Sequence, residues 1–391
     1  MSRAIPYGRQ SISNDDINEV IDVLNSDFLT QGPRVPIFEK NIAKYCSAKY
    51  AVATNSATSS LHSACVALGV GVNDLVWTSA NTFVASSNCA LYCGASVDFV
   101  DIDLKTFNMC PIKLEEKLKI AKKKNNLPKV VIPVHMCGQS CDMEKIYQLS
   151  KNFGFKIIED ASHAIGGSYN NSKIGSCKYS DITVFSFHPV KIITSGEGGM
   201  SLTNDEKLAN KLQMHRTHGI TRNPEMLRIK DQGLWYYEEQ DLGFNYRMTE
   251  INAALGNSQL NRLDQFVEMR HEIAKKYNQD LSDLPLDLPF QLTNNYSSYH
   301  LYVIRLQIEN IEISHKDFFK NIRSEGIGVN LHYIPVYKHP YYKSLKFKDF
   351  ICKNAEQYYK TAISIPIYPD LTISEQDYVV EKISDNLIKR K

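Results

Sequence analysis

From residue 50 onward, short apolar runs alternate with longer segments that have helical periodicity. Each apolar run is four to seven residues long, as expected for strands buried on both faces. The predicted strands are Tyr50–Thr54, 75–79, 97–101, 129–135, Lys156–Glu159, Ile182–Phe187 and Gly199–Thr203. Seven strands joined by helical crossovers predict a mostly parallel α/β sheet covered on both faces. Ligands bind beyond the carboxyl ends of strands in such sheets.

Helical patterns flank this region. Ser13 to Asp16 resembles a capping box, with Ile12 and Ile17 as a possible hydrophobic staple. Ile17, Val20, Ile21 and Leu24 then follow helical spacing. Further helices are predicted at Thr58–Leu68, after Asp142, and from Thr249 to Arg270.

The C-terminal third predicts a smaller α/β unit. Strands are expected at Tyr299–Leu306 and near 328–333, with a helix near 315–325 and a last helix capped by Ser374. We therefore expect a large domain over residues 1–260 and a small domain over 261–391. Residues 222–241 fit neither pattern and predict an irregular segment.

Composition narrows the class of protein. The 391 residues are 43% hydrophobic and 23% charged, with a net charge of +2, which disfavours nucleic acid or an anionic membrane as partner. Residues 1–7 lack the apolar core of a signal peptide, and no stretch approaches a membrane span. The nine cysteines are scattered without a CxxC pair, which predicts reduced thiols in a cytoplasmic protein and no metal site.

A lysine and an aspartate indicate which kind of cofactor the protein binds. Asp160 ends one apolar strand, and Lys191 follows another by four residues, before Ile192, Ile193 and a glycine-rich turn. A lysine amine can form a Schiff base with pyridoxal 5'-phosphate (PLP), and a carboxylate can pair with its protonated pyridine nitrogen. Most lysines are merely surface residues, and an acidic residue after a strand is often only a helix cap.

Other residues fit the same cofactor. Small residues from Asn55 to Ser60 lie between a strand and a helix, where free N–H groups favour a phosphate. Ser186 could add a hydroxyl group, Phe83 an aromatic face, and His163 a contact with the ring or its phenolic oxygen. Each also has a plain structural interpretation, as an N-cap or a satisfied core residue. Their order along the chain is what favours a PLP site over these structural interpretations.

In this order the residues resemble those of the DegT-type nucleotide-sugar aminotransferases, which share the fold of aspartate aminotransferase (PLP fold type I). The matching blocks are Leu29–Pro33 with Phe38–Glu39, Asn55–Thr58, Thr82–Ala85, Asp101–Asp103, Glu159–His163, Ser186–Lys191, Gly196–Gly199, Gly243–Met248, His300–Tyr302, His332–Pro335 and Ile365–Tyr368. They extend over nearly the whole chain.

The resemblance implies roles for matching positions. Lys191 would carry the Schiff base, Asp160 would face the pyridinium, and His163 would be a further catalytic and cofactor contact. The residues expected to hold the cofactor also include Ala57, Thr58, Phe83, Ser186 and, on the neighbouring subunit's phosphate, Asn245. Arg247, Tyr302, His332 and Tyr333 would contact substrate. The family pattern thus implies a homodimer with shared sites.

Histidine at position 163, where many relatives have glutamine, resembles the subgroup that acts at C4 of keto-sugars. The blocks Ile5–Gln10 and Val336–Pro340 resemble enzymes of pseudaminic-acid-type pathways. The implied reaction moves an amino group from glutamate to a UDP-linked 4-keto-6-deoxy-N-acetylhexosamine. Alternatives are a C3- or C4-aminotransferase acting on a dTDP- or GDP-keto-sugar, a non-catalytic PLP-binding regulator, and a hydrolase built on Ser186 and His188.

Overall fold

The computed structural model describes residues 4–387, so the first three and last four residues, including part of the opening segment 1–7, lie outside it. Its main sheet has the order β1-β9-β8-β5-β4-β2-β3. The strands are β1 (Tyr50–Thr54), β2 (Leu75–Ser79), β3 (Ser96–Val100), β4 (Val130–Ile132), β5 (Lys156–Asp160), β8 (Ile182–Ser186) and β9 (Gly199–Thr203). Only β9 runs antiparallel to its neighbours β1 and β8 in this sheet. The predicted mostly parallel, seven-stranded sheet is confirmed.

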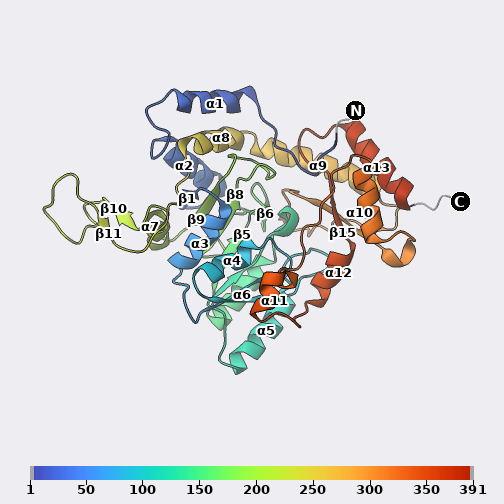
Figure 1. Ribbon diagram of the computed structural model, residues 1–391, viewed down its shortest axis with the longest axis horizontal. Helices are drawn as coiled ribbons and strands as arrows, with labels where there is room; N and C mark the ends of the chain where they lie inside the picture. The colour runs from blue at the N-terminus through green and yellow to red at the C-terminus, as the bar shows by residue number, and fades with distance from the viewer. Residues whose placement is uncertain (1–3, 388–391) are drawn as a thin grey trace.

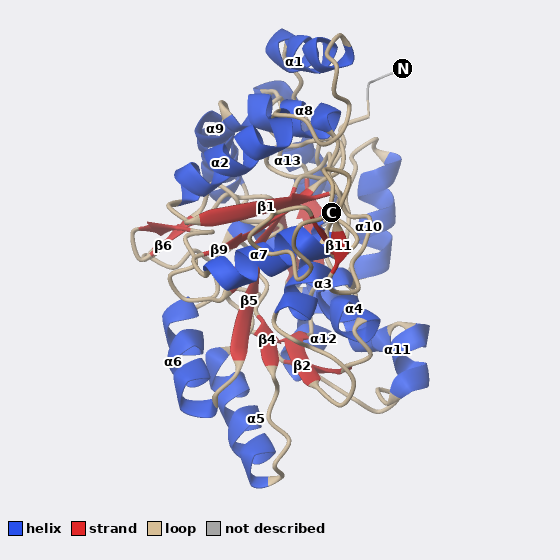
Figure 2. Cartoon of the chain, turned by 90° about the vertical axis from the view of Figure 1, so that its left-hand side faces the viewer, coloured by secondary structure: helices blue, strands red, loops and turns tan. Residues whose placement is uncertain are grey.

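Helices cover both faces of this sheet, as Figure 2 shows. The helices up to residue 260 are α1 (Asn14–Leu24), α2 (Arg34–Cys46), α3 (Ala57–Ala67), α4 (Ala85–Tyr92), α5 (Pro111–Lys123), α6 (Met143–Phe153), α7 (Glu206–His215) and α8 (Glu250–Leu260). Consecutive residues of β5 show the division: Ile157 packs with α5 and α6, whereas Ile158 packs with α3 and α4. This alternation places neighbouring side chains of a strand on opposite faces.

The predicted helix from Thr249 to Arg270 is in fact two helices. The second, α9 (Leu263–Asp280), begins after a break at residues 261 and 262. The capping box at Ser13 is confirmed, with Asp16 as its second member. The proposed staple is not supported, because Ile12 and Ile17 are both about half exposed and belong to no core cluster.

The C-terminal third of the chain contains a three-stranded antiparallel sheet in the order β12-β14-β15. Its elements are β12 (Leu286–Asp287), β14 (Tyr302–Leu306), β15 (Ala362–Ile365), α10 (His315–Ser324), α11 (Pro340–Leu345), α12 (Lys353–Thr361) and α13 (Ile373–Leu387). The strand predicted near 328–333 is wrong, since in it only Asn330 forms an isolated bridge, to Ser364 of β15. The last helix is capped by Thr372 with Glu375, two residues before the predicted Ser374.

Two small sheets complete the fold. One joins β6 (Ser168–Tyr169), β7 (Ser172–Lys173) and β13 (Asn295–Tyr296). The other pairs β10 (Ile220–Thr221) with β11 (Glu238–Glu239) in an arm that projects from the body at the left of Figure 1. Leu234 and Trp235 in this arm are exposed. The segment predicted as irregular, 222–241, forms most of this arm.

No helix within residues 4–387 combines the length and apolar character needed to cross a membrane. The same residues hold no group of three or more metal-binding side chains.

Candidate active site

A cavity of about 970 Å³ lies beyond the carboxyl ends of β4, β5 and β8. Nine of the predicted site residues line it: Ala57, Thr58, Phe83, Asp160, His163, Ser186, Lys191, His332 and Tyr333. They come from six separate segments of the chain. The fold therefore brings together most of the residues that the sequence singled out.

Lys191 lies in the loop that joins β8 to β9. The loop is closed by hydrogen bonds from the Phe187 N–H to the Gly198 carbonyl and from the Ser195 N–H to the Phe187 carbonyl, both 2.9 Å. Burial lowers the pKa of Lys191 to about 8, and the negative charge of Asp160 opposes this shift. A larger share of this amine is therefore neutral near physiological pH, as a nucleophile requires.

Asp160 is held by donors on two sides. Ser86 Oγ donates to its Oδ2 at 2.6 Å, and the Ser162 N–H donates to its Oδ1 at 3.2 Å. Since Ser86 uses its proton on the carboxylate, Thr82 Oγ1 is the donor in the 2.7 Å contact between Thr82 and Ser86. These two donors hold the carboxylate at a fixed position. Sequence reasoning missed Ser86, which lies in the first turn of α4 and reaches Asp160 only through the fold.

The start of α3 forms one wall of the cavity. Ser56 caps the helix by accepting a hydrogen bond from the Ser59 N–H at 3.1 Å. The first N–H groups of a helix have no acceptor within it, and the helix dipole makes this end attractive to an anion. Gly199 of β9 allows the close approach, because a Cβ there would lie 2.5 Å from the Ala57 nitrogen. Ala57 and Thr58 are thus well placed for a phosphate group.

His163 is buried and lies between two rings. Its Nε2 is 3.2 Å from the Tyr333 hydroxyl, and its ring centroid is 4.4 Å from that of His300. Burial lowers the pKa of His163 well below its usual range, and the nearby Lys191 charge lowers it further. Burial also lowers the pKa of His332 to about 3 and raises that of Tyr333. These imidazoles are neutral groups that can accept or donate a hydrogen bond.

Three predicted site residues do not line this cavity. Tyr302 does not line the cavity. It is buried in a core cluster beside β14 and α9, and its hydroxyl donates to Asn278 Oδ1 at 2.6 Å. Asn245 and Arg247 are likewise absent from the lining of this chain's cavity. Sequence reasoning also missed Tyr7, His300, Asn330 and His339, which line it from distant segments.

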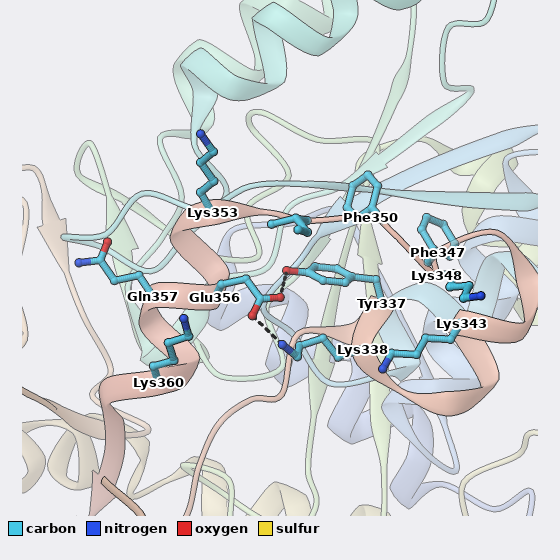
Figure 3. A pocket seen from close by; sticks show the side chains of 11 residues that line it. Tyr337, Lys338, Lys343, Phe347, Lys348, Phe350, Lys353, Glu356, Gln357 and Lys360 are labelled. Carbon is cyan, nitrogen blue, oxygen red and sulfur yellow. Dashed lines mark hydrogen bonds and ion pairs between the residues drawn. The ribbon is translucent and has the colours of Figure 1, made fainter. Parts of the chain in front are cut away.

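A second hollow, of about 530 Å³, is lined by residues between Tyr337 and Lys360 (Figure 3). Five lysines and the rings of Tyr337, Phe347 and Phe350 surround it. Lys338 forms an ion pair with Glu356 at 2.6 Å, and the Tyr337 hydroxyl donates to the same carboxylate at 2.9 Å. None of the predicted site residues lines this hollow.

The large cavity supplies what PLP requires. A lysine with a lowered pKa, an anchored carboxylate and an open helix start surround one space. The hydrolase alternative is not supported, because His188 Nδ1 accepts a hydrogen bond from the Val190 N–H, and no hydrogen bond joins His188 to Ser186 in the described part of the chain. The fold and site define the class: a PLP-dependent enzyme of fold type I.

Comparisons with known proteins identify the family. Residues 10–384 match the DegT/DnrJ/EryC1/StrS aminotransferase family, and the chain belongs to it. The spore coat polysaccharide biosynthesis protein SpsC of Bacillus subtilis is 38% identical over 97% of this chain and 96% of its own. The UDP-4-amino-4,6-dideoxy-N-acetyl-beta-L-altrosamine transaminase of Campylobacter jejuni is 36% identical over 99% and 98%, respectively.

Similar solved structures support the same family assignment. Helicobacter pylori PseC, an aminotransferase involved in the biosynthesis of pseudoaminic acid, superposes with a TM-score of 0.89 at 29% identity, over 98% of this chain and 99% of that one. The PLP form of the sugar aminotransferase Spr1654 from Streptococcus pneumoniae has a TM-score of 0.87 at 28% identity, over 99% and 100%. The protein is a PLP-dependent sugar aminotransferase.

Proposed function

We propose that the protein transfers the amino group of glutamate to the C4 keto carbon of a UDP-linked 4-keto-6-deoxy-N-acetylhexosamine, in amino-sugar biosynthesis of the pseudaminic acid type. The observation that carries the proposal is the convergence of Lys191, Asp160 and His163 on one cavity. The Campylobacter jejuni and Helicobacter pylori relatives support the choice of sugar.

In this proposal each cavity residue has a separate role in the reaction. PLP, when bound, supplies an electron-withdrawing ring. Asp160, fixed by Ser86, keeps a proton on the pyridine nitrogen. Lys191 Nζ would hold the cofactor and, once freed by glutamate, would carry a proton from the α-carbon of glutamate to the cofactor. The same amine later returns a proton to C4 of the sugar.

The remaining residues position the reactants. Ala57 and Thr58 offer N–H groups to the phosphate, and Ser186 adds its hydroxyl. Phe83 and His163 contact the cofactor ring. We assign His332 and Tyr333 to the sugar, because both line the cavity. His332 is held by contacts of its Nδ1 with Ser364 Oγ at 2.8 Å and its Nε2 with Asn330 at 3.3 Å. Binding energy from the nucleotide can then orient the reacting carbon.

We further propose a homodimer with shared sites. Asn245 and Arg247 do not line the cavity of their own chain. We assign Asn245 to the phosphate of the partner subunit's cofactor and Arg247 to the same shared site. The projecting β10–β11 arm (Figure 1), with its exposed Leu234 and Trp235, supports an intermolecular contact on this side. We also propose that the division between large and small domains falls at residues 260 and 261, just before α9.

The test is a pair of half-reactions followed by absorbance. Glutamate should convert the bound cofactor from its aldehyde to its amine form, and a UDP-4-keto-sugar should reverse the change. Competing dTDP- and GDP-keto-sugars, with amino-product analysis, would identify the other aminotransferase class if they reacted faster. Lys191→Ala should fold normally and show no turnover. No spectral change with glutamate would support the non-catalytic regulator.

A further inference from the structure

The second hollow (Figure 3) has an apolar side built from aromatic rings. Tyr337, Phe347 and Phe350 line it, together with Ile351, which is 68% exposed. The rings are fixed, because Phe347 and Phe350 lie 5.5 Å apart between centroids and both contact Phe99 of the main sheet. With about 530 Å³ the hollow falls within the size range of small-molecule sites.

Positive charge is concentrated around the same space. The lining includes five lysines: Lys338, Lys343, Lys348, Lys353 and Lys360. Within residues 4–387 only the first of them forms an ion pair, with Glu356, which is the one acidic residue of the lining. The whole chain, by contrast, is nearly balanced, with 45 basic and 43 acidic residues. Four unpaired ammonium groups around one hollow create a local positive potential that attracts an anion.

Hydrogen bonds hold the segments that carry these lysines. The Tyr337 hydroxyl accepts a hydrogen bond from the Cys352 N–H at 3.1 Å and donates one to Glu356 Oε1 at 2.9 Å. Asp101 accepts a hydrogen bond from the Asn354 N–H at 3.0 Å, so the start of α12 already has an anionic partner. The lysine side chains, rather than the helix end, are therefore the groups left to bind an anion.

This hollow is separate from the active-site cavity. None of the described residues lines both. The short helix η3 (Val336–Lys338) lies between them, since Tyr337 and Lys338 line the hollow whereas His339, the next residue, lines the cavity. The reaction proposed above therefore gives these lysines and rings no role.

We propose that the hollow is a second ligand site and that it binds a nucleoside diphosphate. Lysines are common phosphate ligands, and an aromatic base can pack on Phe350 and Ile351, the apolar side chains of the lining that remain accessible. A phosphate alone would leave this apolar surface uncovered, and an uncharged base would leave the lysines without a partner. The inference goes beyond the proposed reaction and does not depend on which sugar the enzyme uses.

Acetylation of lysines in the holoenzyme, followed by peptide mass spectrometry, tests the site with UDP as the probe. At ten times the dissociation constant about one site in eleven stays free, so acetylation of Lys343 and Lys360 should slow about tenfold. The exposed Lys123 and Lys320 are internal references and should not respond. Pyrophosphate and uridine should each protect only at higher concentrations than UDP. Unchanged acetylation of Lys343 and Lys360 at millimolar UDP, or equal protection by pyrophosphate, would overturn the inference.

The variant Lys343→Gln/Lys360→Gln removes two positive charges and keeps most of each side chain. Its dissociation constant for UDP, measured from protection of Lys348, should rise at least about tenfold, because two charge-assisted contacts are lost. The matched control Lys123→Gln/Lys320→Gln removes the same charge from α5 and α10 and should change the constant by less than about twofold. Equal weakening in both variants would reveal general electrostatic attraction and overturn the site.

The glutamate half-reaction separates this inference from the proposed function. Both double variants should convert the bound cofactor normally, because their replaced lysines do not line the active-site cavity. A wild type that reacts with glutamate but shows no protection by UDP would refute the second site and leave the proposed reaction standing. Protection without any glutamate-driven spectral change would support the second site and refute the reaction.

Discussion

The lowered pKa of Lys191 predicts an unusually reactive amine. With a pKa of about 8, about one Lys191 in eleven is neutral at pH 7. At the ordinary value of 10.5 the neutral share would be about one in three thousand. The buried site therefore raises the concentration of nucleophilic amine by roughly 300-fold at neutral pH. The cause is burial, since Asp160 acts in the opposite direction.

Competitive acylation of the cofactor-free protein measures this directly. Peptide mass spectrometry across pH 6 to 11 should give half-maximal labelling of Lys191 near pH 8, with the exposed Lys123 as an internal reference. In Asp160→Asn the midpoint should move to lower pH, because the variant removes the negative charge that favours the ammonium form. A Lys191 midpoint equal to that of Lys123, or a shift to higher pH in Asp160→Asn, would refute the argument.

Further substitutions test the other parts of the site. Asp160→Asn should reduce kcat at least about 100-fold, as for a lost electrostatic partner, and near-normal turnover would contradict its assignment. Gly199→Ala should lower both the melting temperature and PLP retention, because the new Cβ would lie 2.5 Å from the Ala57 nitrogen; Gly71→Ala, with open space around it, is the control. Asn245→Asp should speed PLP loss on gel filtration by placing negative charge near phosphate, and unchanged retention would argue against a shared site.

Local patterns predicted the large-domain sheet well, because strands buried on both faces are continuous apolar runs. Lys156–Asp160 and Ile182–Ser186 are examples, and Asp160 and Ser186 at their carboxyl ends were found with them. Strands in the C-terminal third were harder to predict from the sequence. Residues 328–333 have strand-like composition but form only one bridge, whereas Ala362–Ile365 is a strand because it pairs with β14. Such pairing depends on residues far away in the chain.

Residues of the active site were likewise predicted only where the local sequence gives a signal. Lys191 and Asp160 stand out because their chemistry is unusual after an apolar strand. Ser86 and His300 have no such signal, since each becomes part of the site only when another segment lies beside it. Tyr302 was expected to contact substrate, but it packs in a core cluster at the start of β14, where its hydroxyl donates to Asn278. Helical spacing identified the stripe Ile17, Ile21 and Leu24 but not which way it faces.

The antiparallel strand β9 has a consequence for synthesis of the protein. Residues Tyr50 to Thr54 find their partner only at Gly199 to Thr203, about 150 positions later. The start of α3, which faces the cavity, follows directly from β1. This wall of the cavity therefore remains incomplete until β9 has left the ribosome. A nascent chain that ends before Gly199 can contain Lys191 and Asp160 and still lack a closed pocket. Vitamin B6 should therefore be captured only after more than half of the polypeptide has been made.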